Sequence, residues 1–178
     1  MNPLEYLSRS QDQLASLCTP LSAEQAERTP GEERWSINGH VEHLAQVERG
    51  ILVLLRRKLG AEATQEELAQ CAGKEELILA RVPQPATRVQ APENVVPQGR
   101  FGPWPGAWQA FAEARQATLA FAAQTPAAQL RSFVHPHAAL GTLNGEQWLL
   151  FLAAHTERHG AHIRGLLNLF ADLFANAD

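Results

Sequence analysis

Three histidines fall on one face of a predicted helix near the end of the chain. In EQWLLFLAAHTERHGAHIRGLLNLF, alternate steps of four and three residues give a single stripe: Trp148, Leu152, His155, His159, His162, Leu166 and Leu169. The stripe is apolar at both ends and carries imidazoles in its middle. Imidazoles one turn apart lie about 5–6 Å from each other at Cβ, close enough to bind one cation together. The spacing therefore indicates a metal site. The alternative is a set of buried histidines satisfied by hydrogen bonds alone, which is costly because protonation would bring like charges together.

Two familiar metal motifs do not fit these residues. HTERH resembles the metalloprotease motif HExxH, but Thr156 stands where the catalytic glutamate belongs. Glu157 lies about 200° around the helix from His155, on the opposite side. A di-iron carboxylate bundle needs Glu-x-x-His pairs, and none of the 7 histidines has a glutamate three residues before it. A mononuclear, histidine-rich site remains.

A second predicted helix carries two further candidate ligands, His40 and His43. Its apolar face is formed by Ile37, Val41, Leu44, Ile51 and Leu55. His40 lies near the centre of this face and His43 near its edge, so periodicity favours His40 as the inward residue. Glu48 also falls within the apolar arc. It could orient a ligand, face a dimer surface, or pair with a basic neighbour.

The candidate residues require long helices to position them. Apolar periodicity predicts four long helices, over residues 3–18, 36–60, 107–124 and 144–174. Ser36 caps the second helix and Gly60 ends it, and either Asn144 or Thr142 caps the fourth. Between the second and third helices lies a long crossover with one short helix, in TQEELAQCAGKEELILARV, and a proline-rich extended piece. No strand is predicted, and His135 and His137 are placed in a loop. The pattern predicts an all-α four-helix bundle forming a single domain over residues 1–178.

Composition narrows the class of protein. The 178 residues are 45% apolar and 19% charged, with a formal net charge of −4, which indicates a folded chain without a basic footprint for nucleic acid. The N-terminus has no signal-peptide pattern, and no uncharged apolar run reaches the length of a membrane span. The two cysteines, Cys18 and Cys71, match no metal or redox spacing. We expect a reduced, cytoplasmic protein, with a single disulfide as the alternative.

Two stretches together resemble the DinB-like superfamily of metal-binding four-helix bundles. They are WSINGHVEHLAQVE and, after the crossover, HPHAALGTLNGEQWLLFLAAHTERHGAHI. The family pattern has Trp-Ser/Thr at the start of the second helix, a histidine eight residues later, and His-x-x-x-His on the last helix after His-Pro and Gly. Transferred to this chain, the pattern implies the metal ligands His43, His155 and His159. Family members commonly carry Gln at the position of His162, so His162 is either a fourth ligand or a proton-transfer group.

The resemblance also implies a chemistry. The expected cofactor is one divalent metal, zinc first, with nickel, iron or manganese as alternatives, in a homodimer. Similar proteins include S-transferases and isomerases that use low-molecular-weight thiols such as bacillithiol or mycothiol, and others described as hydrolases. The expected function is a metal-dependent thiol S-transferase or hydrolase acting on a small molecule. The alternative is a non-catalytic, stress-associated metal-binding dimer with a closed four-histidine site. Phe101, Trp104 and Trp108 either line an apolar substrate pocket or cap the core.

Overall fold

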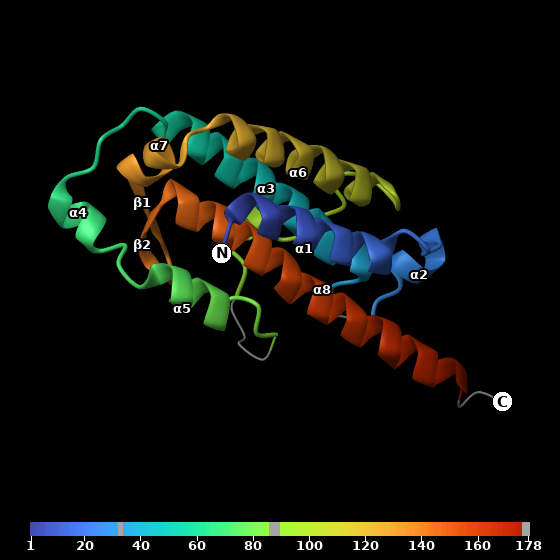
Figure 1. Ribbon diagram of the computed structural model, residues 1–178. Helices are drawn as coiled ribbons and strands as arrows, with labels where there is room; N and C mark the ends of the chain where they lie inside the picture. Colours follow the sequence, from blue (N-terminus) through green and yellow to red (C-terminus); the bar gives the residue numbers. More distant parts are fainter. Residues whose placement is uncertain (32–33, 86–89, 176–178) are drawn as a thin grey trace.

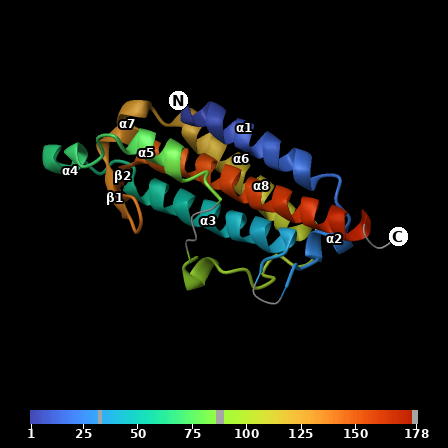
Figure 2. The ribbon, with the colours of Figure 1, turned by 90° about the horizontal axis from the view of Figure 1, so that it is seen from below.

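The computed structural model describes residues 1–31, 34–85 and 90–175. Within these ranges, four long helices lie alongside one another (Figure 1): α1 (Pro3–Cys18), α3 (Ile37–Lys58), α6 (Gly106–Gln124) and α8 (Gly145–Ala175). We call these the bundle helices. α1 packs chiefly on α8, and α3 packs chiefly on α6, while contacts of α1 with α6 and of α3 with α8 close the bundle (Figure 2). The predicted four-helix bundle is confirmed, in a chain that is mainly helical.

Side-chain caps explain where the bundle helices begin. The Ser36 hydroxyl accepts a hydrogen bond from the Gly39 amide at the start of α3. At the start of α8, Asn144 Oδ1 accepts from the Gln147 amide at 2.9 Å, and Gln147 Oε1 accepts from the Asn144 amide at 3.1 Å. Asn144 is thus the cap of α8. Thr142 instead donates its hydroxyl hydrogen to Gln70 Oε1.

Short elements fill the connections, and here the sequence prediction was partly wrong. The connections hold α2 (Ala23–Glu27), α4 (Gln65–Ala69), α5 (Lys74–Arg81), η1 (Glu93–Val95) and α7 (Ala127–Ser132). The single short helix predicted in the crossover is two helices, α4 and α5, because Gly73 between them takes a left-handed conformation with φ of 70°.

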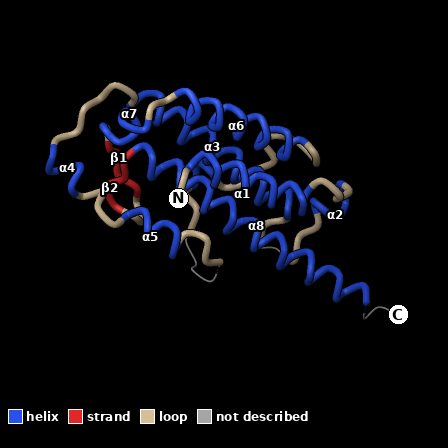
Figure 3. Tube along the Cα trace, in the orientation of Figure 1, coloured by secondary structure: helices blue, strands red, loops and turns tan. Residues whose placement is uncertain are grey.

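The predicted absence of strands was also wrong. β1 (Val134–His137) and β2 (Gly141–Asn144) form an antiparallel hairpin at one end of the bundle (Figure 3). Each strand has only four residues, too few for alternation to stand out in the sequence. Pro136 is compatible with β1 because each strand of a two-stranded sheet has a free edge.

α8 is the longest helix and carries the predicted stripe. The stripe faces the core from Trp148 to Leu166, both less than 10% exposed, but Leu169 is 39% exposed. Phe170, the next residue, is still buried in the core, and the last part of α8 projects beyond the other bundle helices (Figure 1). In the part of the chain that the structure describes, neither α8 nor any other helix combines the length and apolarity needed to cross a membrane.

A polar layer divides the core. Among the described residues, one apolar cluster surrounds Leu7, Leu52 and Leu149, and another surrounds Leu14, Val41 and Ile163. Between the two clusters, each bundle helix contributes a buried polar side chain to one hydrogen-bonded group: Ser10, Glu48, Arg115 and Thr156.

The Arg115 guanidinium joins the members of this layer. Its Nε and Nη2 donate to the two carboxylate oxygens of Glu48 at 2.7 and 3.0 Å. Its remaining hydrogen bonds go to the Leu7 carbonyl, the Ser10 hydroxyl and the Thr156 hydroxyl, at 2.8, 3.0 and 2.8 Å respectively. The Arg115 and Glu48 side chains are 0% and 1% exposed. Of the three roles considered for Glu48, the structure supports pairing with a basic neighbour.

We predict that Arg115→Met lowers the free energy of unfolding by about 3–5 kcal/mol, because it leaves the Glu48 carboxylate buried without its counter-charge. Urea denaturation measures this change. The matched control is Arg49→Met, which removes an exposed pair with Glu113 and should cost no more than about 1 kcal/mol. Equal effects of the two substitutions would contradict the structural role of the buried pair.

Candidate metal site

His43 of α3 meets His155 and His159 of α8 where the two helices lie side by side. His155 Nε2 lies 3.4 Å from His43 Nε2 and 3.2 Å from His159 Nε2. Among the described residues, these three are the histidine, cysteine or acidic side chains whose ligand atoms gather within 4.8 Å of one another. His40, earlier on α3, meets His159 rather than His155, so α3 and α8 run antiparallel at this point.

The nitrogen spacing fits a divalent metal. Zinc bound at about 2.0–2.1 Å in a tetrahedral site holds its ligand nitrogens about 3.3 Å apart, close to both distances found here. His43 Nδ1 donates to the Val95 carbonyl at 2.8 Å. Because a carbonyl only accepts, the His43 proton must lie on Nδ1, which leaves Nε2 bare and facing the group. The donors are therefore suited to a metal in position and, for His43, in tautomer.

The Nδ1 atoms of the other two rings, which are not the atoms that face the group, have different surroundings. His159 Nδ1 lies 2.9 Å from His40 Nδ1, within hydrogen-bonding distance. His155 Nδ1 is buried and has no hydrogen-bond partner among the described residues. The His155 ring is instead held by stacking on Phe151, with centroids 5.3 Å apart and planes at 14°. Each ring is thus oriented by a different kind of contact.

Burial keeps these imidazoles neutral. Burial lowers the pKa of His155 and His159 well below the usual value, and the neighbouring histidines add to the effect. The pKa of His43 is also lowered by burial, although the hydrogen bond to Val95 opposes the shift. Burial, followed by the nearby His162 and His43, lowers the pKa of His40 to about 3. Neutral imidazole is the form that binds metals, so the set is ready to act as a ligand at neutral pH.

The crossover is fastened to α3 beside His43. The buried carboxylate of Glu42 accepts hydrogen bonds from three successive amides, those of Gln98, Gly99 and Arg100, at 2.8, 2.9 and 3.1 Å. This contact holds the segment that follows Val95, whose carbonyl binds His43. Sequence reasoning missed Glu42, and no signal would have found it, because its partners are more than 50 residues away.

Half-buried aromatic rings surround the group. The Trp35 ring lies 5.0 Å from that of His43 and stacks against that of His159 with planes at 10°. The Phe151 ring stacks against that of His155. Phe151 lies four residues before His155, on the same face of the helix, so the sequence spacing could have identified it. The three aromatic residues suggested from sequence instead pack within or against the second apolar cluster, as core caps: Phe101, Trp104 and Trp108.

The remaining candidates lie around the site with different environments. His162 is half-buried, lies outside the group of three, and stacks on His40 with planes at 8°. His135 and His137 belong to the β1 strand rather than a loop. His137 Nδ1 accepts from the backbone amides that follow it, so it stabilises the hairpin turn. Burial lowers the pKa of both His155 and His162, and the positive charge of Arg158 adds to the lowering, so Arg158 lies near the site.

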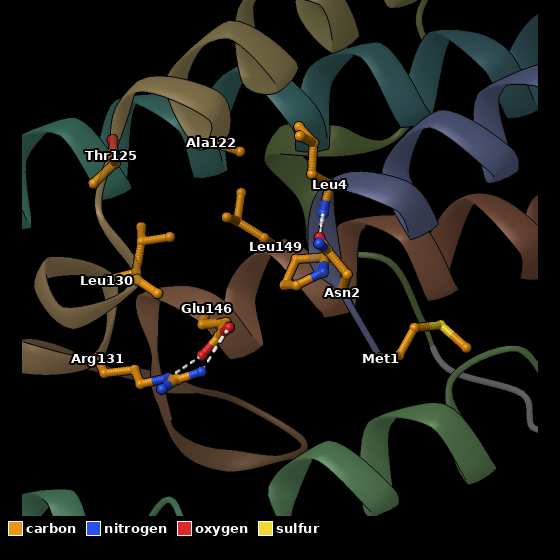
Figure 4. Close-up of a pocket in the computed structure, with 11 residues that line it drawn as sticks. Met1, Asn2, Leu4, Ala122, Thr125, Leu130, Arg131, Glu146 and Leu149 are labelled. Atoms are coloured by element: carbon orange, nitrogen blue, oxygen red, sulfur yellow. Dashed lines mark hydrogen bonds and ion pairs between the residues drawn. The ribbon is translucent and has the colours of Figure 1, made fainter.

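A separate cavity lies where the starts of α1 and α8 meet the end of α6 and α7 (Figure 4). Its volume is about 370 Å³, and Leu4, Leu130 and Leu149 contribute to its lining. Arg131 and Glu146 form an ion pair in its wall. None of the described residues that line this cavity is a histidine, so it is distinct from the candidate metal site.

Comparison with known proteins agrees with the fold. Residues 6–163 match the model of the DinB superfamily, and the chain belongs to this superfamily. Its structure is similar to that of TT2238, described as a four-helix bundle protein, with 20% sequence identity, a TM-score of 0.54, and coverage of 95% of this chain and 96% of that one. None of the curated proteins compared with the chain matches it.

We predict that the metal-free protein loses stability as the pH falls below about 6.5, the pKa of histidine in an unfolded chain. The folded-state pKa values are lowered, so between about 6.5 and the folded value, about 3 for His40, the unfolded state binds more protons. Each such proton lowers the free energy of unfolding by about 1.4 kcal/mol per pH unit. No histidine contribution is expected above that window.

The measurement is urea unfolding in the presence of a chelator between pH 5 and 7.5, where most carboxylates stay ionised. His159→Leu provides the comparison, because it removes one of the most strongly shifted groups and should flatten the profile. A wild-type stability that does not change over this range would contradict the burial argument.

Proposed function

We propose that the protein is a metal-dependent enzyme in which His43, His155 and His159 hold one divalent metal, zinc in the first instance. The observation that carries the proposal is the convergence of the three rings. His155 Nε2 lies 3.2 Å from His159 Nε2 and 3.4 Å from His43 Nε2. Membership of the DinB superfamily supports it.

An open site favours an enzyme over a purely structural metal. Catalytic zinc sites hold three protein ligands and keep one position free, whereas structural sites are closed by four. Of the described residues, no fourth histidine, cysteine or acid joins the group, and His162 is engaged in stacking on His40 instead. A metal bound here would lower the pKa of a thiol or water that reaches it and so supply a nucleophile near neutral pH.

We further propose S-transfer from a low-molecular-weight thiol to a small electrophile, with hydrolysis as the related reaction. In S-transfer the thiol sulfur forms a bond to the electrophilic carbon, the leaving group departs with its electron pair, and the thiol proton passes to solvent. The chain contributes orientation and partial exclusion of water: Trp35 covers the rings of His43 and His159, and Phe151 covers His155. The Arg158 charge acts on His155 and would favour an anionic substrate or thiol.

We predict near-stoichiometric metal in the untagged wild-type protein, and its loss in His43→Ala, His155→Ala and His159→Ala. Each substitution removes one of three donors and should weaken binding by well over tenfold. Elemental analysis after zinc reconstitution measures the content. His135→Ala is the matched control, because this half-buried histidine lies in the hairpin and should leave the content unchanged. A wild type that takes up no metal would overturn the proposal.

Activity is tested on the metal-loaded protein with cysteine, glutathione, bacillithiol or mycothiol as donor and a chlorodinitrobenzene as acceptor. A thiol-dependent rate above the uncatalysed reaction that disappears in His155→Ala supports S-transfer. Ester hydrolysis without any thiol would support the hydrolase instead. Stoichiometric metal with neither activity would favour a non-catalytic metal-binding protein.

A further inference from the structure

His40 occupies a defined place just outside the group of three histidines. Its Nδ1 lies 2.9 Å from His159 Nδ1, while the other nitrogen of the His159 ring, Nε2, faces His155. His40 therefore contacts the outer side of a candidate ligand. Periodicity favoured His40 as the inward residue of α3. Its contact with the outer nitrogen of His159, however, suits a residue that orients a ligand rather than a ligand itself.

The positions of the protons at this contact define that role. A neutral histidine that binds a metal through Nε2 carries its proton on Nδ1. His159 Nδ1 must then donate, and the facing His40 Nδ1 must be the bare acceptor, which places the His40 proton on Nε2. We propose that His40 is a positioning residue that accepts this hydrogen bond and thereby fixes the tautomer and ring orientation of His159. This inference rests on the proposed metal-binding function.

The structure holds His40 itself in place. Its ring stacks on His162 with centroids 5.4 Å apart and planes at 8°, and it meets the Trp35 ring edge-on at 5.4 Å. His40 also lies one helical turn before His43 on α3. A single face of α3 thus supplies one candidate ligand and the acceptor that orients another ligand on α8. The usual acceptor for a metal-bound histidine is a carboxylate, a carbonyl or water; here a second imidazole takes that place.

The experiment compares zinc affinities by competition with a chromophoric chelator in the full-length protein. His40→Leu removes the acceptor and should weaken zinc binding by about 10- to 100-fold. His40→Asn places an amide oxygen near the position of Nδ1 and should recover most of that loss. His135→Leu is the control for the removal of a half-buried histidine and should leave the affinity unchanged.

A second readout follows the proton directly. In the zinc-loaded wild type, long-range ¹H–¹⁵N correlations should show His159 protonated at Nδ1, with a hydrogen-bonded signal that is lost in His40→Leu. Wild-type binding with no change of affinity in His40→Leu overturns the role of His40 and leaves the proposed metal site intact. A His159 proton on Nε2 in the zinc-loaded wild type overturns it as well, even if the leucine variant fails to fold. A wild type that binds no zinc overturns both.

Discussion

The buried guanidinium of Arg115 links the bundle helices, because from α6 it forms hydrogen bonds with each of the other three. It binds Glu48 on α3 and Thr156 on α8, in addition to the backbone and side chain of α1. Thr156 directly follows His155, and Glu48 lies little more than one turn after His43. A slip of α3 along α8 by a single turn, about 5.4 Å, would separate the Nε2 atoms that now lie 3.2 and 3.4 Å apart. Arg115 therefore fixes the register that brings the histidines together, without touching them.

Burial determines both the arrangement and the protonation of the candidate site. The same packing that brings α3 against α8 removes water from the rings of His43 and His159 and lowers their pKa values. Neutral rings bind a metal without first losing a proton. In the absence of a metal the same burial is a source of instability at low pH. The burial that keeps the rings in the metal-binding form therefore lowers the stability of the metal-free fold at low pH.

Segments distant in sequence orient the rings. In the crossover, the Val95 carbonyl accepts a hydrogen bond from His43. The Glu42 carboxylate holds the crossover in place by accepting hydrogen bonds from three of its backbone amides. Such contacts of a side chain with distant backbone leave no periodic trace in a sequence. Phe151 and Trp35 differ in this respect: Phe151 shares the helical face of His155, so its contact follows from spacing alone, whereas the place of Trp35 against His159 depends on how α3 meets α8.

The local features of this protein could be predicted from its sequence. Apolar periodicity, the cap at Ser36 and a cap at either Asn144 or Thr142 predicted the bundle helices, and the spacing of His155 and His159 placed two imidazoles on one face. Both features depend only on residues within a few turns of one another. The identity of the residue that α3 directs into the group depends instead on how the helices pack. Periodicity favoured His40 on α3, yet His43 directs Nε2 into the group and His40 contacts the outer side of His159. The reason is that the direction toward a site is set by the position of α8 against α3, and an apolar arc records only which side of a helix is buried.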